Sequence, residues 1–86
     1  MPEISRFFGV VITMYYDDHL PPHFHARYSG FRAVVAIEHP RLLSGKLPPR
    51  VMGFVVEWVS RHHAELLEDW NLARRRVPLN PIEPLQ

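Results

Sequence analysis

Residues 23–38 read HFHARYSGFRAVVAIE, and this stretch decides the fold. On both sides of Ser29-Gly30 it is rich in β-branched and aromatic residues, which strands prefer. Serine followed by glycine is typical of a tight two-residue turn. The pattern therefore predicts a β-hairpin with strands His23–Tyr28 and Phe31–Glu38.

A first strand is expected upstream, over Ile4–Tyr16, where the sequence is almost continuously apolar, β-branched and aromatic. Gly9 within this run indicates a β-bulge or a close backbone approach. The acids and prolines of residues 17–22 predict a loop, so the first strand should pair antiparallel with the second. A turn region follows at residues 39–46, with room for a short fourth strand around Leu42.

The hydrophobic period changes after residues 47–50, LPPR, which resemble a helix start because proline is tolerated in the first helical turn. One continuous helix of about 25 residues is expected to follow, nearly 40 Å long, so its far end should project or contact a partner. Its apolar stripe comprises Val51, Val55, Trp58, Val59, His62, Leu66, Trp70 and Ala73.

The expected fold class is α+β: a small antiparallel sheet of three or four strands packed against one long C-terminal helix. Residues 1–77 should form a single β-β-β-α domain. Prolines at positions 78, 81 and 84 exclude a helix in residues 78–86. This segment is therefore expected to be an extended tail that docks on its own core or on another subunit.

The composition is that of a globular protein, with 47% apolar and 22% charged residues among 86. There is no cysteine, which excludes disulfides and thiolate metal sites and suits a reducing cytoplasm. Neither a signal-peptide pattern nor an apolar run of membrane-spanning length is evident, so a cytoplasmic protein without membrane contacts is expected. The four glycines are not clustered, which argues against a glycine-rich phosphate loop.

Residues 17–26, DDHLPPHFHA, contain three of the six histidines, two acids and two adjacent prolines. The second and third of these histidines are two positions apart in the expected strand and share a face, and the prolines can fold the first beside them. Imidazoles in this arrangement suit a divalent transition metal such as zinc. Asp17 or Asp18 would supply a further ligand or orient an imidazole. The candidate metal ligands are His19, His23, His25 and Asp18.

Two other interpretations of the histidines remain open. His23 and His25 are candidate catalytic residues, working as a general acid and base as in a metal-free ribonuclease. Arg27 shares their face by strand alternation and could hold a phosphate, while nearby tyrosines could stack on a base. Alternatively, the loop is purely structural, with its imidazoles hydrogen-bonded to backbone or carboxylate groups.

Arg74, Arg75 and Arg76 form a second candidate phosphate site. Their simpler role is to place positive charge at the negative end of the helix dipole, near the C-terminus of the expected helix. Trp58 and Trp70 lie on the same stripe and are expected to be core or interface anchors.

Several motifs together resemble one bacterial family, the domain of unknown function 4160 (DUF4160). They are MPEISRFFG at 1–9, MYYDDH at 14–19, PPHFHA at 21–26, GKLP at 45–48, EWV at 57–59 and ELLEDW at 65–70. The resemblance implies a small partner protein encoded nearby, in an arrangement similar to toxin–antitoxin modules, and some members carry the label of transcriptional regulator.

Taken together, these features predict a small binding module, a toxin–antitoxin-like or regulatory component. It would act through protein contacts and possible nucleic-acid contacts, as a homo-oligomer or with its small partner protein. The alternative is a ribonuclease or metal-dependent hydrolase centred on His19, His23 and His25.

Overall fold

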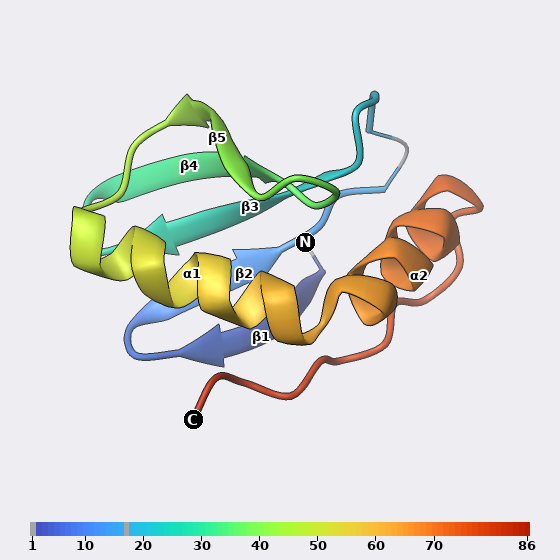
Figure 1. The fold of residues 1–86 in the computed structure, drawn as a ribbon. Coiled ribbons are helices and arrows are strands. Elements are labelled where there is room, and N and C mark those ends of the chain that lie inside the picture. The colour runs from blue at the N-terminus through green and yellow to red at the C-terminus, as the bar shows by residue number, and fades with distance from the viewer. Residues whose placement is uncertain (1, 17) are drawn as a thin grey trace.

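The computed structural model describes residues 2–16 and 18–86, which form a five-stranded sheet and two helices (Figure 1). Neighbouring strands pair antiparallel in chain order, so the sheet is a simple meander. The α+β class predicted from the sequence is confirmed. The elements are β1 (Glu3–Phe7), β2 (Val10–Thr13), β3 (His23–Tyr28), β4 (Phe31–Ala36), β5 (Arg41–Gly45), α1 (Pro49–Arg61) and α2 (His63–Arg74).

The predicted hairpin is confirmed as β3 and β4, whose register runs from His23 opposite Ala36 to Tyr28 opposite Phe31. Ser29 adopts a positive φ of 52°, as a tight hairpin turn requires. The short extra strand expected around Leu42 is β5. The sheet nevertheless has five strands in the described residues, not three or four.

The prediction of one long first strand is wrong, because the chain reverses at Phe8 and Gly9 to give β1 and β2. These two residues have φ values of 49° and 81°, the left-handed conformation that a two-residue hairpin turn needs. Gly9 therefore belongs to a turn and not to a bulge. The sequence does not predict this turn, because residues with bulky side chains rarely adopt a positive φ. Phe8 is an exception.

The prediction of one continuous helix is also wrong. The helical path breaks at His62, whose φ of −127° and ψ of 28° separate α1 from α2. A straight helix over residues 49–74 would be about 39 Å long. That exceeds the longest dimension of the molecule, 33 Å. The break lets Leu66, Trp70 and Ala73 of α2 bury their side chains instead of projecting into solvent.

The core lies between one face of the sheet and α1, which runs across that face (Figure 1). The indole of Trp58 is fully buried, with ring centroids 5.3 Å from Phe7 and 5.7 Å from Phe24. The opposite face of the sheet carries no helix in the described residues. Neither α1 nor α2, the helices of residues 2–16 and 18–86, is long and apolar enough to cross a membrane.

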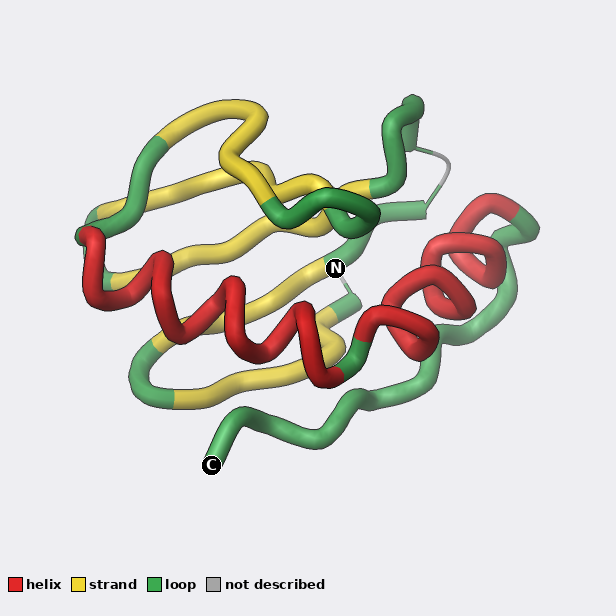
Figure 2. The backbone as a smooth tube through the Cα atoms, in the orientation of Figure 1, coloured by secondary structure: helices red, strands yellow, loops and turns green. Residues whose placement is uncertain are grey.

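The tail after α2 is extended and packs on the protein's own core (Figure 2). The Ile82 amide donates a hydrogen bond to the Ile4 carbonyl at 2.8 Å, so the tail lies along the outer edge of β1. The Trp58 indole N–H donates to the Glu83 carbonyl at 2.9 Å. Ile82 and Leu85 are buried. This segment therefore completes the core and covers one edge of the sheet.

Candidate functional site

The loop before β3 brings Asp18 against the two histidines of that strand. The Asp18 Oδ2 atom lies 2.9 Å from His23 Nε2 and 3.5 Å from His25 Nε2. One ligand atom from each of the three residues lies within 4.8 Å of the other two. We call these three residues the Asp-His-His cluster. Asp17, the other acid considered from the sequence, lies outside the described residues.

Both ring nitrogens of His23 face oxygen atoms. Nδ1 lies 2.7 Å from the Pro21 carbonyl oxygen, and Nε2 lies 2.9 Å from Asp18 Oδ2. The side chain is only 4% exposed, and its ring packs 5.1 Å from the Trp70 ring of α2. The orientation of this imidazole is therefore fixed by the loop backbone on one side and by α2 on the other.

His25 is half-buried, and its Nε2 atom is buried without a hydrogen-bond partner. Burial lowers the pKa of His25 below its ordinary value, although the Asp18 carboxylate opposes this effect. The ring is therefore mainly neutral at pH 7. The ring of Tyr15 stands edge-on against it, with centroids 4.4 Å apart.

The pKa of Asp18 is lowered below its ordinary value. Partial burial acts to raise this pKa, but the hydrogen bond from the His19 amide and the influence of the nearby His23 ring outweigh it. The carboxylate is therefore ionised at neutral pH. The cluster combines this fixed negative charge with two imidazoles.

His19 does not join the cluster. Its side chain is 87% exposed, and its Nε2 atom lies 3.7 Å from the other carboxylate oxygen of Asp18, Oδ1. The His19 amide instead donates to Asp18 Oδ1 at 2.9 Å, which orients the carboxylate. The His19 ring lies at the edge of the cluster, with its centroid 5.6 Å from that of His23.

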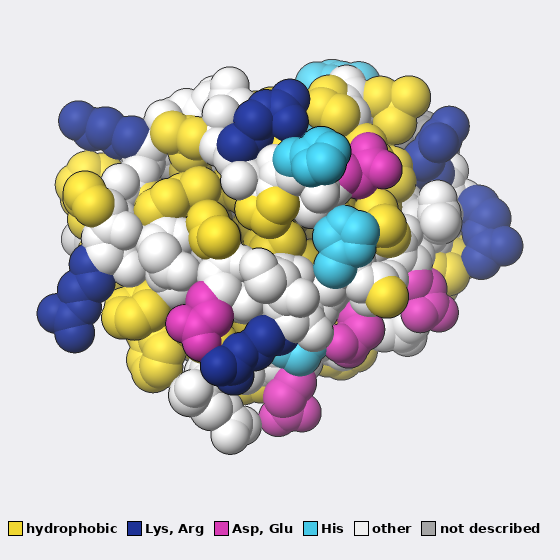
Figure 3. Space-filling model, viewed as in Figure 1, with side chains coloured by type: hydrophobic (Ala, Val, Ile, Leu, Met, Phe, Trp, Pro, Cys, Tyr) yellow, Lys and Arg dark blue, Asp and Glu magenta, His cyan; other side chains and the backbone are white. Residues whose placement is uncertain are grey.

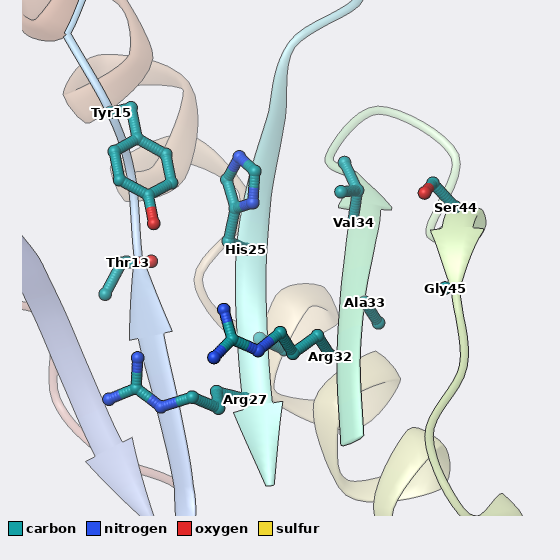
Figure 4. Close-up of a pocket in the computed structure, with 10 residues that line it drawn as sticks. Thr13, Tyr15, His25, Arg27, Arg32, Ala33, Val34, Ser44 and Gly45 are labelled. Atoms are coloured by element: carbon teal, nitrogen blue, oxygen red, sulfur yellow. The ribbon is translucent and has the colours of Figure 1, made fainter. Parts of the chain in front are cut away.

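A shallow cleft of about 170 Å³ lies beside the cluster on the helix-free face of the sheet (Figure 4). Arg27 of β3 and Arg32 of β4 stand directly opposite each other there, and both are exposed. Tyr15 and His25 line the same cleft. Arg27 was expected on this face from strand alternation. The sequence reasoning missed Arg32, although the two-residue turn of the hairpin already places it opposite Arg27.

The three arginines near the chain end are separate from this region. Arg74, Arg75 and Arg76 are exposed at the C-terminal end of α2, and none of them lines either of the clefts that contain His25.

Trp58 and Trp70 are buried core residues, one on each helix. On the face shown in Figure 3, histidine side chains reach the surface beside both acidic and basic ones. The surface there is mixed in charge and is not a continuous basic patch.

The family model described as domain of unknown function (DUF4160) matches residues 9–71. The chain belongs to this family. The match begins at the β1–β2 turn and ends in α2, so it includes the histidine loop, the hairpin and α1. Comparisons with curated proteins and with solved structures find no match.

Proposed function

We propose that this DUF4160 protein is a small binding module that holds single-stranded nucleic acid on the helix-free face of its sheet. The observation that carries the proposal is the pair of opposed arginines, Arg27 and Arg32. Like charges directly opposite each other on neighbouring strands destabilise a sheet. An arrangement of this kind gains stability when an anion binds between the two cations.

No acidic side chain of the described residues forms an ion pair with either arginine. The pKa of Glu3 is lowered by two hydrogen bonds, of 2.8 and 3.0 Å, that its carboxylate accepts from Arg6, and the charge of Arg27 helps to lower it. Both guanidinium groups are thus available to a ligand. Guanidinium groups match phosphate oxygens with two parallel hydrogen bonds, so phosphate is the anion that fits best.

The aromatic neighbour of the arginines favours a single strand over a duplex. Tyr15 lines the same cleft, and unpaired bases stack on aromatic side chains while a basic groove follows the backbone. Tyr16 follows it in the chain and is 43% exposed. A duplex keeps its bases stacked on one another and would leave the Tyr15 ring without a stacked base.

A protein partner is the second part of the proposal, in a toxin–antitoxin-like or regulatory pair. The tail covers the outer edge of β1, but no described strand pairs with the outer edge of β5. Four of the five residues of β5 are exposed, Leu42 among them. An open edge of this kind accepts a strand from another chain, which supports a second copy or a small partner protein at β5.

Fluorescence anisotropy with a labelled single-stranded RNA tests the nucleic-acid proposal. Wild type should bind at low salt, and the double variant R27A/R32A should bind much more weakly. Loss of two phosphate contacts should also reduce the slope of log K against log salt by about 1.4. The matched control is R74A/R75A, which removes two exposed cations elsewhere and should bind like wild type. An equal loss of RNA affinity in both double variants would contradict the proposal.

A hydrolase, either ribonuclease-like or metal-dependent, is the second candidate function. It is favoured by the position of His25, which lines the arginine cleft and also belongs to the Asp-His-His cluster. A neutral imidazole beside a bound phosphate is placed to act as a general base. In a cleavage assay on the same RNA, H25A should then abolish cleavage while leaving anisotropy nearly unchanged. RNA that stays intact with wild type at all protein concentrations excludes this candidate.

A further inference from the structure

We infer that Asp18, His23 and His25 form a binding site for one divalent transition-metal cation such as Zn²⁺. This inference goes beyond nucleic-acid binding and holds whether or not the sheet face binds RNA, because it does not depend on Arg27 or Arg32. Three observations support it: the hydrogen-bond accounting within the cluster, the spacing of its ligand atoms and the second contacts of each imidazole.

The hydrogen bonds of the cluster leave a position between His23 and Asp18 that a proton or a metal cation would fill. The Pro21 carbonyl can only accept, so the hydrogen on the His23 ring must sit on Nδ1 for the 2.7 Å bond to form. In the neutral ring, Nε2 then presents a lone pair to Asp18 Oδ2 at 2.9 Å. An ionised carboxylate also only accepts, so these two atoms repel unless a proton or a metal ion lies between them.

In the tautomer with its hydrogen on Nδ1, His25 presents a third lone pair at the same point. Its Nε2 atom is buried, has no hydrogen-bond partner and lies 3.5 Å from the same carboxylate oxygen. A buried polar atom without a partner is unfavourable, and metal coordination would satisfy it. One cation would therefore resolve two separate defects of the cluster.

The spacing of the ligand atoms suits such an ion. Zinc lies about 2.0–2.1 Å from imidazole nitrogen and carboxylate oxygen, which places tetrahedral ligands about 3.4 Å apart. The two distances from Asp18 Oδ2, 2.9 and 3.5 Å, bracket this separation. All three ligand atoms lie within 4.8 Å of one another.

Neighbouring groups orient the two imidazoles in the way that is common around metal-binding histidines. A metal-binding histidine usually donates its other ring N–H to a backbone carbonyl or a carboxylate, which fixes the tautomer, and His23 does so to Pro21. The Trp70 ring supports His23, and the Tyr15 ring supports His25. Both imidazoles are therefore oriented before a metal binds.

The donor set selects the class of ion. Two imidazole nitrogens and one carboxylate oxygen suit Zn²⁺ and its neighbours Co²⁺, Ni²⁺ and Fe²⁺, whereas Mg²⁺ and Ca²⁺ prefer oxygen ligands alone. Three protein ligands also leave at least one coordination position open. The three ligands line a cleft of about 380 Å³ together with Leu43 and Ser44, so the open position would be accessible to water or a small ligand.

Titration of the full chain with Zn²⁺ and with Co²⁺, after treatment with a chelator, tests the inference. Isothermal titration calorimetry should give one Zn²⁺ per chain, and bound Co²⁺ should show the intense visible absorption of a tetrahedral site. Loss of a ligand should weaken Zn²⁺ binding by about 100-fold or more, since loss of a supporting hydrogen bond alone costs 10–100-fold. Zn²⁺ should raise the melting temperature of wild type but not of the ligand variants.

Asp18→Asn is the most informative variant, because it keeps the shape of the side chain and lies in a partly exposed loop. His25→Ala serves as the second, since His23 is buried and its replacement endangers folding. His39→Ala and His63→Ala are matched controls at exposed positions and should bind Zn²⁺ like wild type. His19→Ala should also bind normally. Unchanged affinity in both ligand variants, or a comparable loss in His19→Ala, would overturn the assignment.

Discussion

Replacing Ile82 with alanine should destabilise the protein strongly although it lies four residues from the chain end. Its side chain is 4% exposed and belongs to the main core. Removing a buried isoleucine side chain to its Cβ costs about 2–5 kcal/mol. The lower part of that range, about 2–3 kcal/mol, applies here because an extended tail can relax into the cavity. The amide bond from Ile82 to Ile4 is retained in the variant, so only side-chain burial is lost.

That loss is large for this domain, since 86 residues correspond to a total stability of roughly 4–13 kcal/mol. In a domain of this size the melting temperature should fall by about 10–20 °C. Urea unfolding followed by tryptophan fluorescence measures the effect, and Trp58 reports directly because its indole bonds the Glu83 carbonyl. The matched control is Glu83→Ala, whose side chain is exposed. A difference below about 0.5 kcal/mol between the two variants would refute the docked tail.

Two further stability predictions follow from backbone geometry and from buried charge. Gly45→Ala should destabilise by about 2–4 kcal/mol in thermal unfolding, since φ is 75° and an added Cβ would lie 2.1 Å from the Arg32 carbonyl oxygen. Gly30→Ala, with open space around it, should change stability little. Burial raises the pKa of Asp69 despite the opposing hydrogen bond from the Asn80 amide. The folded state therefore binds the carboxyl proton of Asp69 more readily than the unfolded state does. The stabilisation that this proton provides is lost as pH rises above about 4. The stability of Asp69→Asn relative to wild type should increase from pH 4 to pH 7 in urea titrations, and a constant difference would contradict this.

The parts of the fold that follow simple periodicities could be predicted from the sequence. The hairpin around Ser29-Gly30 has the expected register, and the predicted apolar stripe supplies every buried residue of the two helices except Asp69. The turn at Phe8-Gly9 could not be predicted, because its positive φ at Phe8 is imposed by tertiary structure and not by local preference. The break at His62 has no glycine or proline to mark it. The break lets Leu66, Trp70 and Ala73 pack into the core.

Part of the candidate site could also be predicted from the sequence. Strand alternation correctly places His23, His25 and Arg27 on one face. The sequence could not show that Asp18 faces both histidines while the His19 ring points into solvent, because the path of an irregular loop depends on contacts distant in the chain. The opposed position of Arg32 follows from the turn, but its significance depends on the absence of an acidic partner in the described structure.

The most direct test of the central claim is an NMR titration of ¹⁵N-labelled protein with a short single-stranded RNA. The account predicts that chemical shifts change on the helix-free face of the sheet, at Tyr15, His25, Arg27 and Arg32 and at their strand neighbours. The amides of α2 near Arg74 and Arg75 should not move. Shifts confined to α2, or no shifts at low salt, would contradict the claim that the opposed arginines bind nucleic acid.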